Sequence, residues 1–143
     1  MIIKVSTSIF SRIKTVDRAL QKAMHGDEIF LTDGKYIEDI IINKHVKLIA
    51  KMTASVFLEG VFIIPKDTHV TFENLTIHPT TQLYVEGKIT LINCSLIGAT
   101  TNVLLSINEG QAVIEKCRFS GASDIGIALL QNSHAVIENC YFE

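Results

Sequence analysis

The sequence predicts an all-β solenoid, namely a right-handed parallel β-helix with an N-terminal capping α-helix. The first observation is a segment that repeats along the second half of the chain at a step of 23 residues. Cysteine marks the same position in three copies, and leucine takes its place in a copy that lies 19 residues earlier. Such a period is typical of solenoids, in which each repeat buries its apolar face against its neighbours. The four copies are residues 69–77, 88–98, 111–121 and 134–143.

The second observation is a polar corner inside each copy. A copy consists of a short alternating strand, one polar residue and a second short alternating strand. In the last copy, Ile137, Cys140 and Phe142 cannot all face one side at a strict period of two. They can do so if a residue between them adopts the left-handed backbone conformation, which asparagine tolerates better than most residues. The corner residues of the four copies are Asn74, Asn93, Lys116 and Asn139.

The third observation is that stacking the copies aligns similar apolar residues in three inward columns. An antiparallel sandwich of short strands would explain the alternation, but neither the fixed step nor the repeated corner. We therefore prefer the parallel β-helix. The columns are Phe72, Leu91, Ile114 and Ile137; Leu75, Cys94, Cys117 and Cys140; and Ile77, Leu96, Phe119 and Phe142.

Length and composition suit one domain over residues 1–143. We expect an N-terminal strand and cap helix over residues 1–26 and stacked coils over residues 27–143. Hydrophobic residues make up 48% of the chain and the mean hydropathy is +0.32, which fits parallel strands that are covered on their faces. We also expect the chain to be the N-terminal part of a longer protein.

Charge and cysteine usage exclude several classes of partner and cofactor. The formal net charge of −2 gives no strong field for nucleic acid or for an anionic membrane, and neither partner is expected. The first residues lack the pattern of a secretory signal. The three cysteines lack the spacing of a zinc or redox motif, so no metal or other cofactor is expected. Cysteines on neighbouring coils could form a disulfide, but we expect all three to be buried free thiols. Together with the missing secretory signal, free thiols favour a cytoplasmic location.

The N-terminal region contains the helix that we expect to cap the core. Residues 2–5 suit a short strand, and residues 6–11 suit a loop. A helix should follow, with Thr15 as its N-cap and Gly26 just beyond its end. Its apolar residues fall near one face, which would cover the open end of the first coil. They are Ile13, Val16, Leu20, Ala23 and Met24.

Residues 26–50, GDEIFLTDGKYIEDIIINKHVKLIA, carry a family resemblance. The Gly26–Asp27 pair, the turn at residues 33–38 and the apolar run at residues 40–42 resemble the first coil of the pectin lyase-like right-handed β-helix superfamily. The N-terminal coil is similar to that of pectin methylesterases. The resemblance spans about residues 13–50, and the later repeats extend it along the chain. It implies the fold, and it leaves the activity open because this coil is a scaffold in many unrelated members.

The catalytic patterns of that superfamily are absent. Its enzymes use clustered carboxylates, a calcium site with an arginine or lysine base, or an Asp/Asp/Arg set. The tripeptide Arg12-Ile13-Lys14 is known from the polygalacturonases, but here it precedes the cap helix and is treated as chance. We therefore expect a non-catalytic binding or scaffold domain. The alternatives are an N-terminal fragment of a polysaccharide lyase, hydrolase or esterase, and an N-terminal recognition module of a larger multidomain protein such as an ATPase.

Other polar residues are expected to be structural. Asp33, Glu38 and Asp39 suit a solvated corner near the first turn. A column of Glu73, Glu115 and Glu138, interrupted by Ile92, suits a solvated face more than a cation site. His45, His69 and His134 recur where strands start on different coils, which suits turns.

One strip of polar residues is a candidate binding surface for a glycan or a peptide. The connections that differ between copies gather at one corner, at residues 78–82, 98–102 and 121–124, and such corners border the binding face of many solenoids. The strand that follows this corner carries hydrogen-bonding side chains on successive coils. The candidate residues are Tyr84, Glu86, Ser106, Asn108, Gln131 and Asn132.

The last coil is a candidate surface for self-association. It would present an apolar cross-section and unpaired strand edges. A second copy could cover it about a two-fold axis, giving a homodimer with Ile137 and Phe142 near the centre of the contact.

Overall fold

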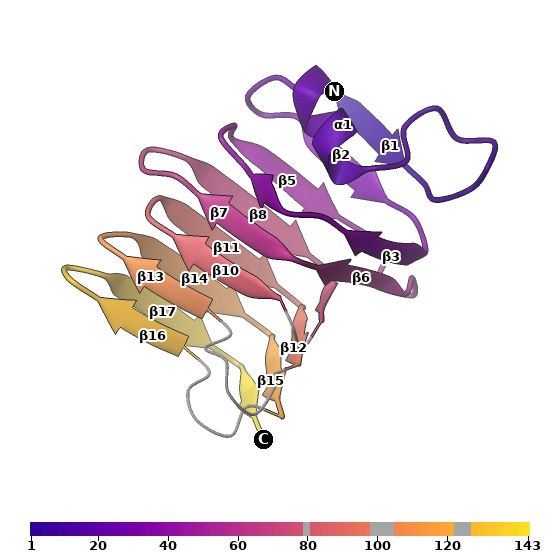
Figure 1. Cartoon of the computed structure of the whole chain (residues 1–143). Helices are drawn as coiled ribbons and strands as arrows, with labels where there is room; N and C mark the ends of the chain where they lie inside the picture. Colours follow the sequence, from indigo (N-terminus) through magenta and orange to yellow (C-terminus); the bar gives the residue numbers. More distant parts are fainter. Residues whose placement is uncertain (79–80, 98–104, 122–126) are drawn as a thin grey trace.

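The computed structural model is a parallel β-solenoid of about six turns with one short helix near the N-terminus. It describes residues 1–78, 81–97, 105–121 and 127–143. Each complete turn contributes one strand to each of three parallel sheets, which form the walls of the solenoid (Figure 1). The predicted fold class is therefore confirmed.

We call the seven-stranded, six-stranded and five-stranded sheets A, B and C, respectively. Sheet A contains β1 (Ile2–Val5), β2 (Glu28–Leu31), β5 (Val46–Ile49), β8 (His69–Glu73), β11 (Lys88–Ile92), β14 (Gln111–Glu115) and β17 (His134–Glu138). Sheet B contains β3 (Gly34–Ile37), β6 (Val56–Glu59), β9 (Thr76–Ile77), β12 (Ser95–Ile97), β15 (Arg118–Ser120) and β18 (Tyr141–Phe142). Sheet C contains β4 (Ile40–Ile41), β7 (Val61–Ile64), β10 (Gln82–Val85), β13 (Leu105–Asn108) and β16 (Ile127–Leu130).

The corner between sheets A and B is a single left-handed residue, as the sequence predicts. The φ angles of Asn74, Asn93, Lys116 and Asn139 lie between 51° and 62°. The asparagine amides also connect adjacent coils. Asn93 Nδ2 donates to Asn74 Oδ1 at 2.9 Å, and Asn74 Nδ2 donates to the Ala50 carbonyl at 2.7 Å. These bonds satisfy polar groups at a point where the chain leaves the ladder.

The first and third inward columns are in register across the strand pairs. The cysteine column lies between the strands at the corner, where Cys94 N contacts Cys117 Sγ of the next coil at 3.4 Å. The members of all three columns are buried in the inner coils, where Cys94 and Cys117 pack as small apolar side chains. All three cysteine thiols are free. The last coil is less buried than the inner coils because β16, β17 and β18 are edge strands of their sheets. There, Ile137 and Phe142 are 43% and 54% exposed, and Cys140 is half-buried.

The cap helix α1 (Val16–Lys22) packs on β1 and β2 and buries Val16, Ala19 and Leu20 in the core. Its predicted N-cap is confirmed, because the Thr15 hydroxyl oxygen accepts a hydrogen bond from Arg18 N at 3.1 Å.

The end of the helix differs from the prediction. The helix stops at Lys22, and Ala23 has an extended backbone with ψ of 151°. Lys44 Nζ donates to the Leu20 and Ala23 carbonyls, and Asp27 Oδ2 accepts from Met24 N at 2.8 Å. These side chains satisfy the terminal backbone groups, so the chain turns before Gly26. Met24, predicted on the apolar face, is exposed.

Candidate functional site

The predicted strip divides between a sheet face and the turns beside it. Tyr84 and Ser106 are register partners on the outer face of sheet C, and Tyr84 is 42% exposed. Its hydroxyl donates to Gln82 Oε1 at 2.8 Å. Asn108 pairs with Leu130 at the end of the strands. The structure therefore brings Tyr84 and Ser106 together.

The other three strip residues lie in turns between sheets C and A. Glu86 follows β10, and the Gln131 carbonyl accepts from Glu109 N at 3.0 Å. Asn132 has a φ of 51°, which places it in the left-handed region as a turn residue. These residues belong to a second surface, along the edge where sheet C meets sheet A.

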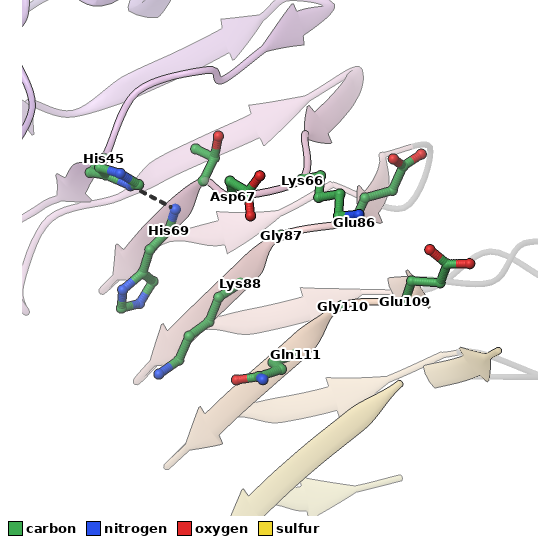
Figure 2. A pocket seen from close by; sticks show the side chains of 11 residues that line it. His45, Lys66, Asp67, His69, Glu86, Gly87, Lys88, Glu109, Gly110 and Gln111 are labelled. Carbon is green, nitrogen blue, oxygen red and sulfur yellow. Dashed lines mark hydrogen bonds between the residues drawn. The ribbon is translucent and has the colours of Figure 1, made fainter. Parts of the chain in front are cut away.

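A shallow groove of about 290 Å³ runs across these turns, and we call it the C–A groove. Gly87 and Gly110 form its floor, and residues from four successive turns line it, beginning with His45 (Figure 2). Glu86 and Glu109 point to one side of the floor, whereas Lys88 and Gln111 point to the other (Figure 2). Lys66, Asp67 and His69 extend the groove toward the N-terminal coils.

Close stacking of the turns explains the glycine floor. A Cβ atom on Gly87 would lie 2.2 Å from the Thr68 carbonyl oxygen, and one on Gly110 would lie 2.6 Å from the Gly87 carbonyl oxygen. Backbone bonds hold the walls at the coil spacing, because Lys88 N donates to the Thr68 carbonyl and Gln111 N to the Gly87 carbonyl. Sequence reasoning missed this site, although the dipeptide Glu-Gly recurs at 86–87 and 109–110 with the 23-residue step.

Histidines form a ladder at the N-terminal end of the groove. His25 Nδ1 accepts from His45 N, and His45 Nδ1 accepts from His69 N, both at 3.0 Å. His69 Nε2 lies 3.0 Å from Thr90 Oγ1. Partial burial lowers the pKa of His69, and the nearby Lys88 and His45 lower it further.

His45 therefore has the turn role that the sequence predicts, whereas the His69 ring contacts Thr90 on the neighbouring strand. His45 and His69 occupy adjacent coils. His134 shares the register column of His69, but Lys88 and Gln111 lie between them.

The acidic residues of the first turn are also structural. Asp33 Oδ1 accepts from Ser55 N at 2.7 Å, and Asp39 Oδ1 accepts from Val61 N at 2.9 Å. The Glu38 carboxylate accepts from Val16 N at 2.8 Å and from Asp17 N at 2.9 Å, at the start of α1.

The glutamate column is in register across sheet A, from Glu73 through Ile92 to Glu115 and Glu138. Within the described ranges, no three His, Cys, Asp or Glu side chains gather closely enough to hold a metal ion.

The outer face of sheet C carries an apolar column that the sequence reasoning did not identify. Ile41, Ile63 and Tyr84 are consecutive register partners, and Ile41 is largely exposed. The column leads to Ser106 on the next coil. The expected loop insertions before sheet C include residues 79–80, 98–104 and 122–126, which lie outside the described residues.

Comparison with protein families gives one result. The sequence model of a family described as a right-handed β-helix region matches residues 29–143. Searches of curated proteins and of solved structures gave no match, so the resemblance to pectin methylesterases has no support there. Across the part of the chain that the structure describes, no helix has the length and apolar character needed to cross a bilayer.

Proposed function

The chain belongs to the right-handed β-helix family, and from this premise we propose that it is a non-catalytic domain that binds a neutral glycan in the C–A groove. One observation carries the proposal. Polar side chains from successive coils flank a glycine floor, so an extended ligand that runs along the solenoid meets a similar set of groups on each coil.

The chemistry of the groove suits sugar hydroxyls, which both donate and accept hydrogen bonds. Glu86 and Glu109 supply acceptors on one side. Lys88 supplies donors on the other side, and the Gln111 amide supplies both. Adjacent turns are about 4.8 Å apart, so an extended chain would contact two or three of them.

The charge of the groove favours a neutral ligand over an acidic one. Asp67, Glu86 and Glu109 outnumber Lys66 and Lys88 by one, which leaves no surplus of lysine charge to neutralise the carboxylates of a uronan.

The arrangement of the carboxylates supports binding rather than hydrolysis. A glycosidase needs two carboxyl groups that flank the scissile bond from opposite sides. Glu86 and Glu109 lie on the same side of the floor, and the facing side holds Lys88 and Gln111 (Figure 2).

Calorimetry with a panel of neutral and uronic-acid oligosaccharides tests the proposal. We expect a neutral oligosaccharide to bind and to be recovered uncleaved. Glu109→Gln and Gln111→Ala should each weaken binding about fivefold to tenfold, because each removes a charged or bidentate hydrogen bond.

The matched control is Glu115→Gln, which removes the same charge on the outer face of sheet A, away from the groove lining. Its affinity should equal that of the wild type. Failure of every neutral glycan to bind, or binding that is indifferent to Glu109 and Gln111, would contradict the proposal.

A second candidate function is recognition of a protein through the outer face of sheet C. It is favoured by the exposed column of Ile41, Ile63 and Tyr84, since aligned apolar side chains are typical of interaction surfaces. The variant Ile41→Ser separates the two functions, because it should weaken a protein contact and leave glycan affinity unchanged.

A further inference from the structure

The loop between β1 and α1 projects from the body of the solenoid (Figure 1). Ile9 and Phe10 occupy its tip, where they are 80% and 90% exposed. They are the central residues of a turn that is closed by a hydrogen bond of 3.0 Å from Ser11 N to the Ser8 carbonyl. Two adjacent apolar side chains are therefore held out into solvent by a defined turn.

Serine hydroxyls and backbone bonds pair several of the polar backbone groups of this loop. Ser6 Oγ accepts from Ser8 N at 3.2 Å, and Ser8 Oγ accepts from Phe10 N at 3.3 Å. Ser11 Oγ donates to the Ile13 carbonyl at 2.8 Å, and Ser6 N donates to the same carbonyl at 3.1 Å. Backbone groups that are already paired lower the cost of moving the tip out of water.

A cationic hollow lies directly behind the tip. Lys4 and Arg12 line it, together with hydroxyl groups that include those of Ser6, Ser8 and Thr32. Among the described residues, neither Lys4 nor Arg12 forms an ion pair with a carboxylate.

The local charge is opposite in sign to that of the whole chain. The first sixteen residues contain Lys4, Arg12 and Lys14 and no acidic residue, whereas the formal net charge of the chain is −2. The overall charge argues against binding to an anionic membrane, but residues 1–16 carry a local positive charge.

We propose that the loop at residues 6–14 docks the protein peripherally on a lipid surface that contains anionic headgroups. Ile9 and Phe10 enter the boundary between headgroups and acyl chains, and the hollow lined by Lys4 and Arg12 receives a phosphate or carboxylate of a headgroup. The chemistry is that of interfacial anchors, which combine a small apolar insertion with basic residues. Two side chains form too small a patch for a stable protein interface, which favours the lipid surface over a protein groove.

The chain contains no tryptophan, so Phe10→Trp introduces a single reporter at the tip. With vesicles of phosphatidylcholine containing about one third phosphatidylserine, we expect its emission to shift to the blue and the protein to sediment with the vesicles. Vesicles of pure phosphatidylcholine should produce neither effect. Inorganic phosphate alone should leave the emission unchanged, which distinguishes a headgroup from a free anion.

Charge and apolar contacts are tested by separate variants. Arg12→Ala should weaken partition onto the anionic vesicles about fivefold, and Ile9→Ser combined with Phe10→Ser should weaken it more than tenfold. Lys47→Gln, which removes a basic residue on sheet A, should partition like the wild type. Added salt should release the protein because it screens the charges.

Three results would overturn the proposal: no blue shift with anionic vesicles, equal partition onto neutral vesicles, or partition that is insensitive to Arg12. A melting temperature like that of the wild type shows that each variant is folded. Glycan binding in the C–A groove is independent of this loop, so the two proposals fail separately.

Discussion

At the residue scale, side chains of one coil hold the backbone of the next. His45 Nδ1 accepts from His69 N, Asp33 from Ser55 N, and Asp39 from Val61 N. Each bond satisfies an N–H group at the first residue of a strand or just before it. These histidine and aspartate side chains therefore stabilise the stacking of coils.

The lowered pKa of His69 makes stability depend on pH. Its pKa in the folded state lies below the ordinary value of 6.5 in the unfolded chain, so the unfolded chain takes up the proton more readily. The contribution is fully present above about pH 6.5 and is lost as the pH falls through the folded pKa. We expect the melting temperature to fall on acidification in this window, measured by calorimetry. His69→Gln should flatten the dependence; an unchanged slope in that variant would assign the effect to other groups.

The cysteines should react at different rates with a thiol reagent. Cys94 and Cys117 are buried, whereas Cys140 is half-buried on an edge coil. A hydrogen bond shared with Cys117, together with burial, raises the pKa of the Cys94 thiol. We expect one thiol to label readily in the native protein and two to label only after denaturation. Cys140→Ser should remove the fast phase, and rapid native labelling of two or more thiols would contradict the observed burial.

The corner residues were predictable because the left-handed conformation strongly favours asparagine, and three of the four corners carry it. The hydrogen bonds of His45, Asp33 and Glu38 were not, since each joins residues more than twenty positions apart. Such pairings depend on where the coils stack, and sequence spacing within one turn does not reveal them.

At the element scale, α1 is held at both ends by the first complete coil. The Glu38 carboxylate accepts from Val16 N and Asp17 N, and Lys44 Nζ donates to the carbonyls of Leu20 and Ala23. Both charges complement the helix dipole. A helix of seven residues is too short to be stable by itself, so its packing and these two side chains determine its position and its end.

A charge on the buried face of α1 should destabilise the protein. Leu20→Asp places a carboxylate against the core under the helix, and we expect a loss of about 3–5 kcal/mol in the free energy of unfolding. Chemical denaturation measures the loss. Arg18→Asp adds a carboxylate to the exposed face of the same helix and should change stability by less than about 0.5 kcal/mol. Similar stability of Leu20→Asp and the wild type would contradict the capping role.

At the scale of the whole molecule, the two ends of the solenoid differ. α1 covers the core at the N-terminal end, whereas edge strands of all three sheets lie together at the other. A second copy cannot stack on the covered end. End-to-end stacking of two such molecules would therefore use the edges formed by β16, β17 and β18.

We expect self-association through these edges, with Ile137 and Phe142 near the centre. A two-fold axis at Val136 would pair β17 antiparallel with its counterpart and place His134 opposite Glu138, which are complementary in charge. Sedimentation should show a concentration-dependent dimer that Phe142→Lys abolishes. Ile2→Lys, an equally apolar and exposed position at the covered end, is the matched control. A wild type that stays monomeric at high concentration would contradict the expectation.

The repeat was sufficient to predict the solenoid, because period and register follow from residues that recur. The C–A groove was less accessible to prediction. Alternation indicates which side chains point outward, but not which turns leave a hollow between them. The predicted strip therefore combined residues of two surfaces. Tyr84 and Ser106 share the outer face of sheet C, whereas Glu86, Gln131 and Asn132 belong to the turns between sheets C and A.

The position of the cap has a consequence for synthesis on the ribosome. β1 and α1 emerge from the ribosome before the coils that follow them. Each later coil can therefore pair with coils that are already folded and whose N-terminal end is covered by α1. At translation rates of about 5–20 residues per second, a coil of 23 residues emerges in roughly 1–5 s. Pairing of neighbouring strands is fast by comparison, since a β-hairpin forms in about 1–10 μs. The nascent chain should therefore expose about one unpaired apolar coil at a time. Dilution from denaturant offers no such order, since all coils are released together. Vectorial synthesis should therefore give a higher yield of folded protein than refolding in vitro.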